Sequence, residues 1–158
     1  MLRTIAAVLA AAAIAGAAGA AGTPENALPA DPLRSRLLAV QVAAEQAKPE
    51  AFHRAFAELT RAMLTLLPER GEAMDLVHLY AEIDELWRHQ LEAPNGAFFE
   101  EGDPLMVLMT RHSGWHEAVQ SQLLRIGPRT YYPTRESRDF LVREARARLA
   151  MADAAAAH

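Results

Sequence analysis

Two histidines, His112 and His116, are the residues whose type and spacing point most directly to chemistry. They lie four positions apart in a segment where apolar residues recur at helical spacing, so one continuous helix would place both imidazoles on its apolar face. Two imidazoles one turn apart can share a zinc, copper or iron ion, and either can bind the iron of a non-covalent haem. Met109 belongs to the same face, and His53 on an earlier helix could supply a further ligand.

The same histidine pair also has a structural interpretation. A buried imidazole without hydrogen-bond partners costs about 1–3 kcal/mol, so each ring must find a carboxylate, a carbonyl, a water or a metal. If side chains of neighbouring helices provide these partners, both histidines simply pack in the core. We favour this role over metal or haem binding, and leave open that the stripe is a surface for a partner protein.

A second polar cluster, formed by His78, Glu82 and His89, lies on the helix expected at about 72–91. The spacing H-x-x-x-E on this helix and H-x-x-x-H on the next resembles part of the hemerythrin di-iron pattern. That pattern also takes a histidine from the last helix, and the segment 135–151 contains none. The cluster lies opposite the apolar stripe of its own helix, so we expect a solvated face with at most a weak surface site for zinc or copper.

No complete catalytic motif is present. The sequence lacks G-x-S-x-G, a phosphate-binding P-loop and H-E-x-x-H, so we assign no catalytic residues and favour a non-enzymatic protein. The absence of cysteine excludes disulfides, thiolate metal sites and haem attached through C-x-x-C-H. A weaker hypothesis is a small-molecule carrier with an aromatic pocket formed by Phe98, Phe99, Tyr131 and Tyr132.

The first residues predict export. One arginine, an apolar run and a small-residue exit describe a signal peptide over 1–20, cleaved after Ala20 or as late as Gly22. Alanine-rich composition and a single lysine, Lys48, suggest a bacterial coding sequence, so we expect a periplasmic or secreted protein. A net charge of −4 without a basic stripe argues against nucleic-acid binding. The mature chain has no segment that could span a membrane.

The remaining chain predicts one all-α domain. We expect a flexible lead-in at 21–31, a four- or five-helix antiparallel bundle at 32–152, and a disordered tail at 153–158. Periodicity and proline or glycine breaks predict helices beginning at Pro32, following Pro49 up to Pro68, and over about 72–91, 103–126 and 134–151. Whether Pro49 kinks one helix or separates two is left open. No strand pattern is evident.

Two functions therefore remain in competition. The first is an exported accessory protein that binds another periplasmic protein and uses its histidines structurally. The second is a metal- or haem-binding bundle in which His112 and His116 are ligands.

Overall fold

The computed structural model describes residues 32–65 and 71–156 and shows a predominantly helical protein with one small sheet. The helical class is confirmed in this coarse form, whereas the expectation of a chain without strands is wrong. The signal peptide expected at 1–20 or 1–22 and the lead-in at 21–31 lie outside the described residues. The elements are α1 (Pro32–Glu45), α2 (Pro49–Thr65), α3 (Gly71–Glu92), β1 (Phe98–Glu100), α4 (Pro104–Met109), α5 (Trp115–Val119), the 3-10 turn η1 (Gln120–Gln122), β2 (Leu124–Ile126), β3 (Arg129–Pro133) and α6 (Thr134–Ala156).

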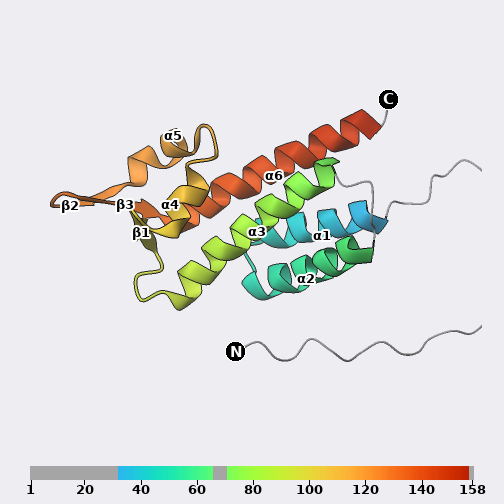
Figure 1. The fold of residues 1–158 in the computed structure, drawn as a ribbon, viewed down its shortest axis with the longest axis horizontal. Coiled ribbons are helices and arrows are strands. Elements are labelled where there is room, and N and C mark those ends of the chain that lie inside the picture. The colour runs from blue at the N-terminus through green and yellow to red at the C-terminus, as the bar shows by residue number, and fades with distance from the viewer. Residues whose placement is uncertain (1–31, 66–70, 157–158) are drawn as a thin grey trace, which may run out of the picture.

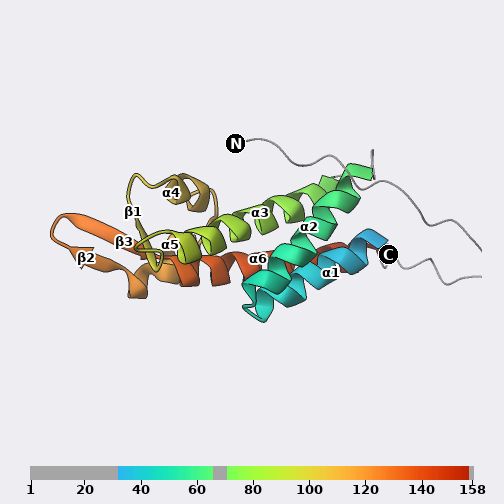
Figure 2. The same cartoon turned by 90° about the horizontal axis from the view of Figure 1, so that it is seen from below.

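The four longer helices pack in two neighbouring pairs. α3 lies along α6, α1 lies against α2, and α1 also contacts α6 (Figures 1 and 2). The colour gradient shows that the helices of each pair run in opposite directions. Their shared core includes Phe52, Leu59, Ile83, Leu86 and Leu141, all fully buried. Burial stabilises the fold by about 1.5–3 kcal/mol for each such side chain.

Pro49 separates two helices. α1 ends at Glu45, and Ala47 adopts a left-handed backbone with φ of 52°. α2 then begins at Pro49, where the missing N–H is harmless and the fixed φ suits a first helical residue. The question that the sequence left open is therefore resolved by the positive φ of Ala47.

A buried polar link ties α1 to α3 and α6. Gln41, only 4% exposed, donates from Nε2 to the carbonyl oxygen of Val142 at 3.1 Å. The Tyr80 hydroxyl donates to Gln41 Oε1 at 3.1 Å. The Gln41 amide and the Tyr80 hydroxyl therefore both have partners, which avoids the cost of burying them unsatisfied.

The long helix expected over 103–126 is wrong. Asp103 does cap α4, accepting a hydrogen bond from Leu105 N at 2.9 Å, but this helix ends at Met109. Gly114 has a φ of 81°, which breaks helical geometry before α5 begins. The apolar stripe therefore comes from two short helices joined by a turn, and β2 follows them.

The sheet has the order β1-β3-β2 with antiparallel pairing throughout. Gly127 and Pro128, expected to end a helix, instead join β2 to β3. Their neighbours Ile126 and Arg129 pair directly, so the loop contains only these two residues. A positive φ of 59° at Gly127 followed by the fixed φ of proline suits a type II′ hairpin turn.

The last helix, α6, is anchored through a buried face that includes Leu141, Val142, Ala145 and Leu149. Its four main apolar residues are buried, and Arg138 is 3% exposed, with its guanidinium 3.7 Å from the Trp87 ring centroid. Arg138 therefore packs between α6 and α3. α6 also continues to Ala156, so residues 153–156 of the expected disordered tail are helical, and Asp153 pairs with Arg34 at 2.7 Å.

The start of α6 is held by the hydroxyl of Ser137 and not by that of Thr134. The Thr134 hydroxyl is buried and has no hydrogen-bond partner among the described residues. The Ser137 hydroxyl instead donates to the carbonyl oxygen of Pro133 at 2.7 Å and accepts from Trp115 Nε1 at 3.0 Å. The start of α6 is therefore fixed to α5 through a serine one turn inside the helix.

None of the helices within the described ranges is long and apolar enough to cross a membrane.

Candidate functional site

The candidate site is a chain of three side chains centred on His112. Its Nε2 lies 2.7 Å from Glu82 Oε2, and its Nδ1 lies 2.8 Å from Glu144 Oε2. The three side chains are 9%, 17% and 23% exposed respectively. We call this set the Glu–His–Glu link, because it joins the turn that follows α4 to both α3 and α6.

Local backbone geometry presents His112 to the two helices. Its N–H donates to the Met109 carbonyl oxygen at 3.1 Å, and its own carbonyl oxygen accepts from Trp115 N at 3.3 Å. These bonds fix the tight turn between α4 and α5. The ring also meets the Phe140 ring edge-on, with centroids 6.4 Å apart. The imidazole is therefore oriented by backbone, carboxylates and an aromatic side chain together.

The charges of the link balance when His112 is an imidazolium. Ionised carboxylates only accept hydrogen bonds, so both ring nitrogens must donate to satisfy Glu82 and Glu144 together. Arg148 adds a second cation, since its Nη2 donates to Glu144 Oε1. Two carboxylates, one guanidinium and one imidazolium then sum to zero charge. A neutral ring could donate to only one of the two carboxylates.

Glu82 is the clearest departure from the sequence expectation. Its cluster was expected to face water, yet Glu82 points to the buried side of α3 and bonds His112. His78 is exposed, as expected for a solvated face, and His89 is half-buried. The structure thus separates the three members of that cluster.

His116 lies apart from the Glu–His–Glu link. It is exposed on α5, with its ring 6.0 Å from the Tyr132 centroid and 6.2 Å from that of Trp115. Because the chain turns at Gly114, the histidines no longer share one helical face. They do line one cavity of about 370 Å³, bordered by Met106, Thr110, His112, Gly114, Trp115, His116 and Glu117.

The described residues contain no group of three or more His, Asp or Glu side chains arranged to hold a metal ion. In the Glu–His–Glu link, the two carboxylates contact opposite ring nitrogens, so they cannot converge on one ion bound to His112. A metal at either nitrogen would have to displace a carboxylate bond of 2.7 or 2.8 Å. Met109 is fully buried in the core.

His53 belongs to a separate polar chain. Its Nδ1 lies 2.7 Å from Asp84 Oδ1, and Asp84 Oδ2 accepts from Arg88 Nη2 at 2.8 Å. These bonds link α2 to α3, and they include no residue of the Glu–His–Glu link. The structure therefore does not bring the four proposed metal ligands together.

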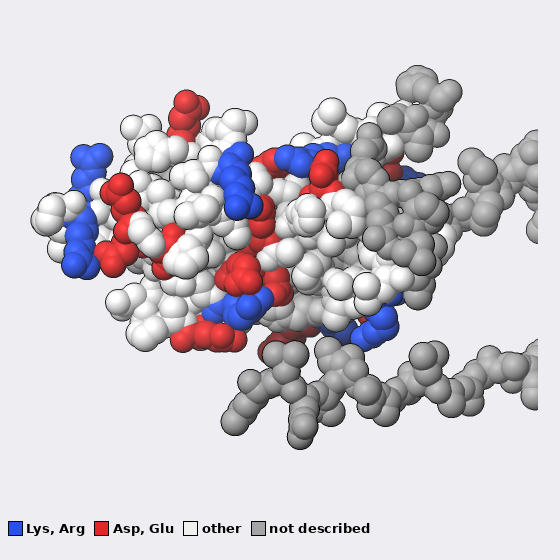
Figure 3. Space-filling view, in the orientation of Figure 1, with Lys and Arg blue, Asp and Glu red and all other residues white. Residues whose placement is uncertain are grey.

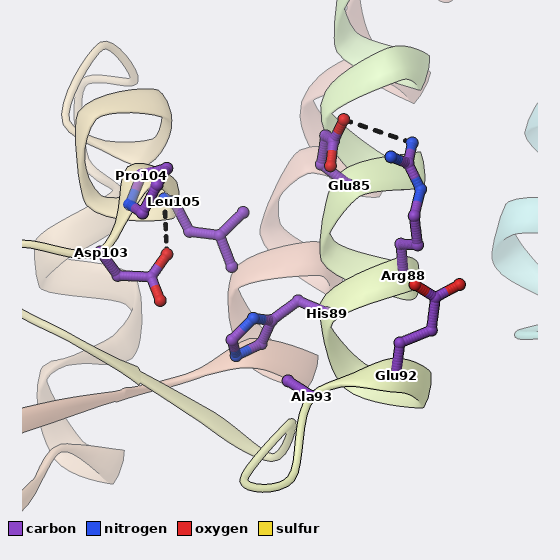
Figure 4. A pocket seen from close by; sticks show the side chains of 8 residues that line it. All are labelled: Glu85, Arg88, His89, Glu92, Ala93, Asp103, Pro104 and Leu105. Atoms are coloured by element: carbon purple, nitrogen blue, oxygen red, sulfur yellow. Dashed lines mark hydrogen bonds and ion pairs between the residues drawn. The ribbon is translucent and has the colours of Figure 1, made fainter. Parts of the chain in front are cut away.

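A larger cavity of about 440 Å³ lies beside His89, between α3 and the start of α4. Figure 4 shows the His89 ring projecting from α3 toward Asp103 and Leu105. His89 Nε2 bonds the Phe98 carbonyl oxygen at 3.0 Å, and Asp103 serves as the cap of α4. Among the lining residues, Glu85 pairs with Arg88 at 3.2 Å. These polar groups are therefore mostly engaged in holding the fold.

The expected aromatic pocket is a packed cluster. Phe99 and Tyr132 face each other across β1 and β3, with ring centroids 5.8 Å apart, and both contact Trp115. All three rings are at least nine-tenths buried. Phe98 and Tyr131 are half-buried on the other face of the sheet. The rings fill the space that a carrier would need for its ligand.

Two important residues escaped sequence reasoning. Glu144 is one of many charged residues on α6, and Gln41 is the polar residue in the otherwise apolar stretch 37–44 of α1. Only their long-range partners distinguish them, and those depend on the register between helices.

No protein family, curated protein or solved structure matches this chain.

Proposed function

We propose that this chain is an exported, non-enzymatic interaction protein in which a helical bundle, periplasmic after removal of the signal peptide, presents a binding surface. His112 is then a structural residue. The observation that carries the proposal is the engagement of both His112 ring nitrogens by carboxylates, at 2.7 and 2.8 Å. A ring used in this way offers no lone pair to a metal, a haem iron or a substrate proton.

The wider surface supports binding rather than catalysis. In the 370 Å³ cavity beside His112, no nucleophile among the lining residues is bonded to an imidazole base. Exposed apolar side chains, in contrast, gather on β2, where both Leu124 and Ile126 face solvent. The acidic chain favours a protein partner over a nucleic acid.

The test is the metal content and absorption spectrum of protein recovered from the periplasm after expression of the full chain. We expect protein without bound zinc, copper or iron and without a haem band, for the wild type and for His112→Ala/His116→Ala alike. Stoichiometric metal or haem in the wild type that is lost in the double variant would contradict the proposal.

Metal binding is the second candidate, because His112 and His116 line the same cavity. It requires His112 to release Glu82 or Glu144 when metal binds. Addition of zinc would then raise the melting temperature of the wild type and not that of His116→Ala. A zinc response that is equal in both proteins would exclude this pair as the ligand set.

A further inference from the structure

The β2–β3 hairpin carries exposed apolar side chains that packing among the described residues does not explain. Both views show it projecting beyond the helices (Figures 1 and 2). All three residues of β2 are exposed, with Leu124 at 42% and Ile126 at 57%. Large apolar side chains so placed cost solubility and indicate a contact surface when they lie together.

β2 is also an edge strand. In the order β1-β3-β2, it pairs with β3 on one side, and no strand among the described residues pairs with its other side. The free side of an edge strand carries backbone N–H and C=O groups that can accept another strand. The hairpin therefore offers directional hydrogen bonds as well as apolar area.

The two faces of β2 differ in chemistry. Leu124 lies opposite Tyr131, and Ile126 lies opposite Arg129, so these residues share the outer face of the sheet. Arg125 lies opposite Thr130 and projects to the other face. A strand added at this edge would meet two apolar side chains on one face and a guanidinium on the other.

The charge of the hairpin is opposite to that of the whole chain. Residues 120–133 include Arg125 and Arg129 and no acidic residue, whereas the chain has a net charge of −4. Figure 3 shows basic side chains at the end of the molecule where the hairpin projects. Arg129 pairs with Glu100 at 3.2 Å, but Arg125 forms no ion pair within the described residues. Arg125 is thus free to meet an acidic group.

The charge of Arg125 and the unpaired backbone of β2 argue against two possible ligands of this edge strand, a second copy of the chain and a membrane. Antiparallel pairing of β2 with the same strand of a second copy, centred on Arg125, would place two arginines directly opposite, which is destabilising. Insertion into an anionic membrane would suit the Leu, Ile and Arg side chains. However, it would leave the unpaired strand edge in hydrocarbon, where backbone groups must be satisfied internally.

We propose that β2 binds an extended segment of a partner protein in which an acidic residue stands between two apolar residues. The segment extends the sheet as an added strand. Its acidic side chain meets Arg125, while its apolar neighbours pack beside Leu124 and Ile126. This proposal rests on the proposed function, since it names the partner chemistry of the interaction protein.

The test uses two capped pentapeptides that differ in charge. One has the sequence threonine-valine-glutamate-valine-threonine, and the other carries lysine in place of glutamate. Each is added to ¹⁵N-labelled protein produced from the full chain. We expect the amide signals of 124–126 to shift, with roughly fivefold tighter binding of the glutamate peptide, since the charge at one cross-strand pair changes sign.

Two variants give the controls. Arg125→Glu reverses the charge of the strand, so it should prefer the lysine peptide by a similar factor. Arg143→Glu makes the same change at an exposed arginine of α6 without a described ion-pair partner, and it should keep the preference of the wild type. A glutamate peptide that is N-methylated at its glutamate should bind neither protein, because in an antiparallel pair centred on Arg125 the glutamate N–H is the donor that faces β2. Circular dichroism verifies that each variant is folded.

Several outcomes would overturn the proposal. These are unshifted 124–126 amides, equal binding of the two peptides, self-association through β2, or binding to phosphatidylglycerol vesicles that depends on Arg125 while the peptides have no effect. Metal analysis of the same sample keeps the proposed function separate. A metal-free protein that ignores both peptides refutes this partner alone, whereas bound metal at His112 refutes the proposed function.

Discussion

At the scale of single residues, His112 shows how one side chain can hold three elements together. Its two ring nitrogens reach Glu82 on α3 and Glu144 on α6, while its backbone closes the turn between α4 and α5. Removal of the ring would leave two partly buried carboxylates facing each other without a donor between them. The resulting loss in the free energy of unfolding arises from desolvated charge as much as from lost hydrogen bonds.

We therefore expect His112→Ala and His116→Ala to differ sharply. His112→Ala should lower the free energy of unfolding by about 2–3 kcal/mol, because it leaves Glu82 and Glu144 unsatisfied. His116→Ala should change it by less than about 0.5 kcal/mol, because its ring is exposed. Urea unfolding followed by circular dichroism measures both. Similar losses for the two variants would mean that the histidines act as a pair.

Tyr80 gives a prediction for alkaline pH. Burial raises the pKa of Tyr80 well above its usual value near 10, and the charge of Glu45 raises this pKa further. Above pH 10 the unfolded chain loses the tyrosine proton while the native protein keeps it. The free energy of unfolding should then fall with rising pH, by at most about 1.4 kcal/mol per pH unit, and should be unaffected by this group below that range.

Tyr80→Phe checks this linkage. The variant should lose about 1 kcal/mol at neutral pH, because the hydrogen bond to Gln41 is removed. Above pH 10 its stability should fall less steeply than that of the wild type. Urea titrations at several pH values provide the comparison, and parallel slopes for the two proteins would refute the assignment.

At the scale of elements, Gly114 decides how the candidate site is built. Its positive φ sets the N-cap of α5 at the end of the turn 110–114, and this turn places His112 inward while His116 stays on the surface. A Cβ at this position would meet nothing within 4 Å. The requirement for glycine here is therefore one of backbone conformation, not of space.

Gly114→Ala should accordingly destabilise the fold by about 1 kcal/mol, the cost of placing an L-residue in the left-handed region. Gly114→Asn should lose less, since asparagine tolerates that region better. Thermal melting distinguishes them. Increased stability of the alanine variant would instead favour the continuous helix that the periodicity suggests.

The sequence predicts the long helices well for a physical reason. The segment 72–91, expected from its repeating apolar residues, is helical as α3 from Gly71 to Glu92. Its pattern persists over several turns, so local signals and burial agree. The cap at Asp103 followed by Pro104 was likewise readable, because it depends only on neighbouring residues.

The sheet and the core of the site could not be predicted in the same way. β1 and β2 have three residues each, too few to show an alternating pattern. The partnership of His112 with Glu82 and Glu144 depends on how α3 and α6 are placed, and no local rule fixes that register. Helical spacing alone put His112 and His116 on one face, because it gave no weight to the glycine between them.

At the scale of the whole molecule, α3 and α6 form the centre to which the other parts attach. α1 contacts α6, α4 contacts α3, and α5 contacts α6. The segment from α4 to the hairpin is held to this centre by the Glu–His–Glu link and by the aromatic cluster of Phe99, Trp115 and Tyr132. The exposed β2–β3 hairpin therefore projects from a segment that is held tightly to α3 and α6.

Hydrogen exchange should distinguish the central pair α3 and α6 from the segment that runs from α4 to the hairpin. Amides of α3 and α6 should exchange last, through global unfolding, whereas those of 120–130 should exchange earlier through local opening. His112→Ala should speed exchange in 104–122 more than in α2, since it releases the turn from both helices. Mass spectrometry of peptic fragments gives the comparison, and uniform acceleration along the chain would contradict a local tie.

The most direct test of the structural role of His112 is a long-range ¹H–¹⁵N spectrum of its imidazole in the protein produced from the full chain. We predict protons on both ring nitrogens, each hydrogen-bonded to a carboxylate, and signals that do not change when zinc is added. Glu82→Gln and Glu144→Gln should each perturb a different ring nitrogen, which assigns the two bonds. A ring nitrogen without a proton that shifts on zinc binding would contradict the account and identify His112 as a ligand.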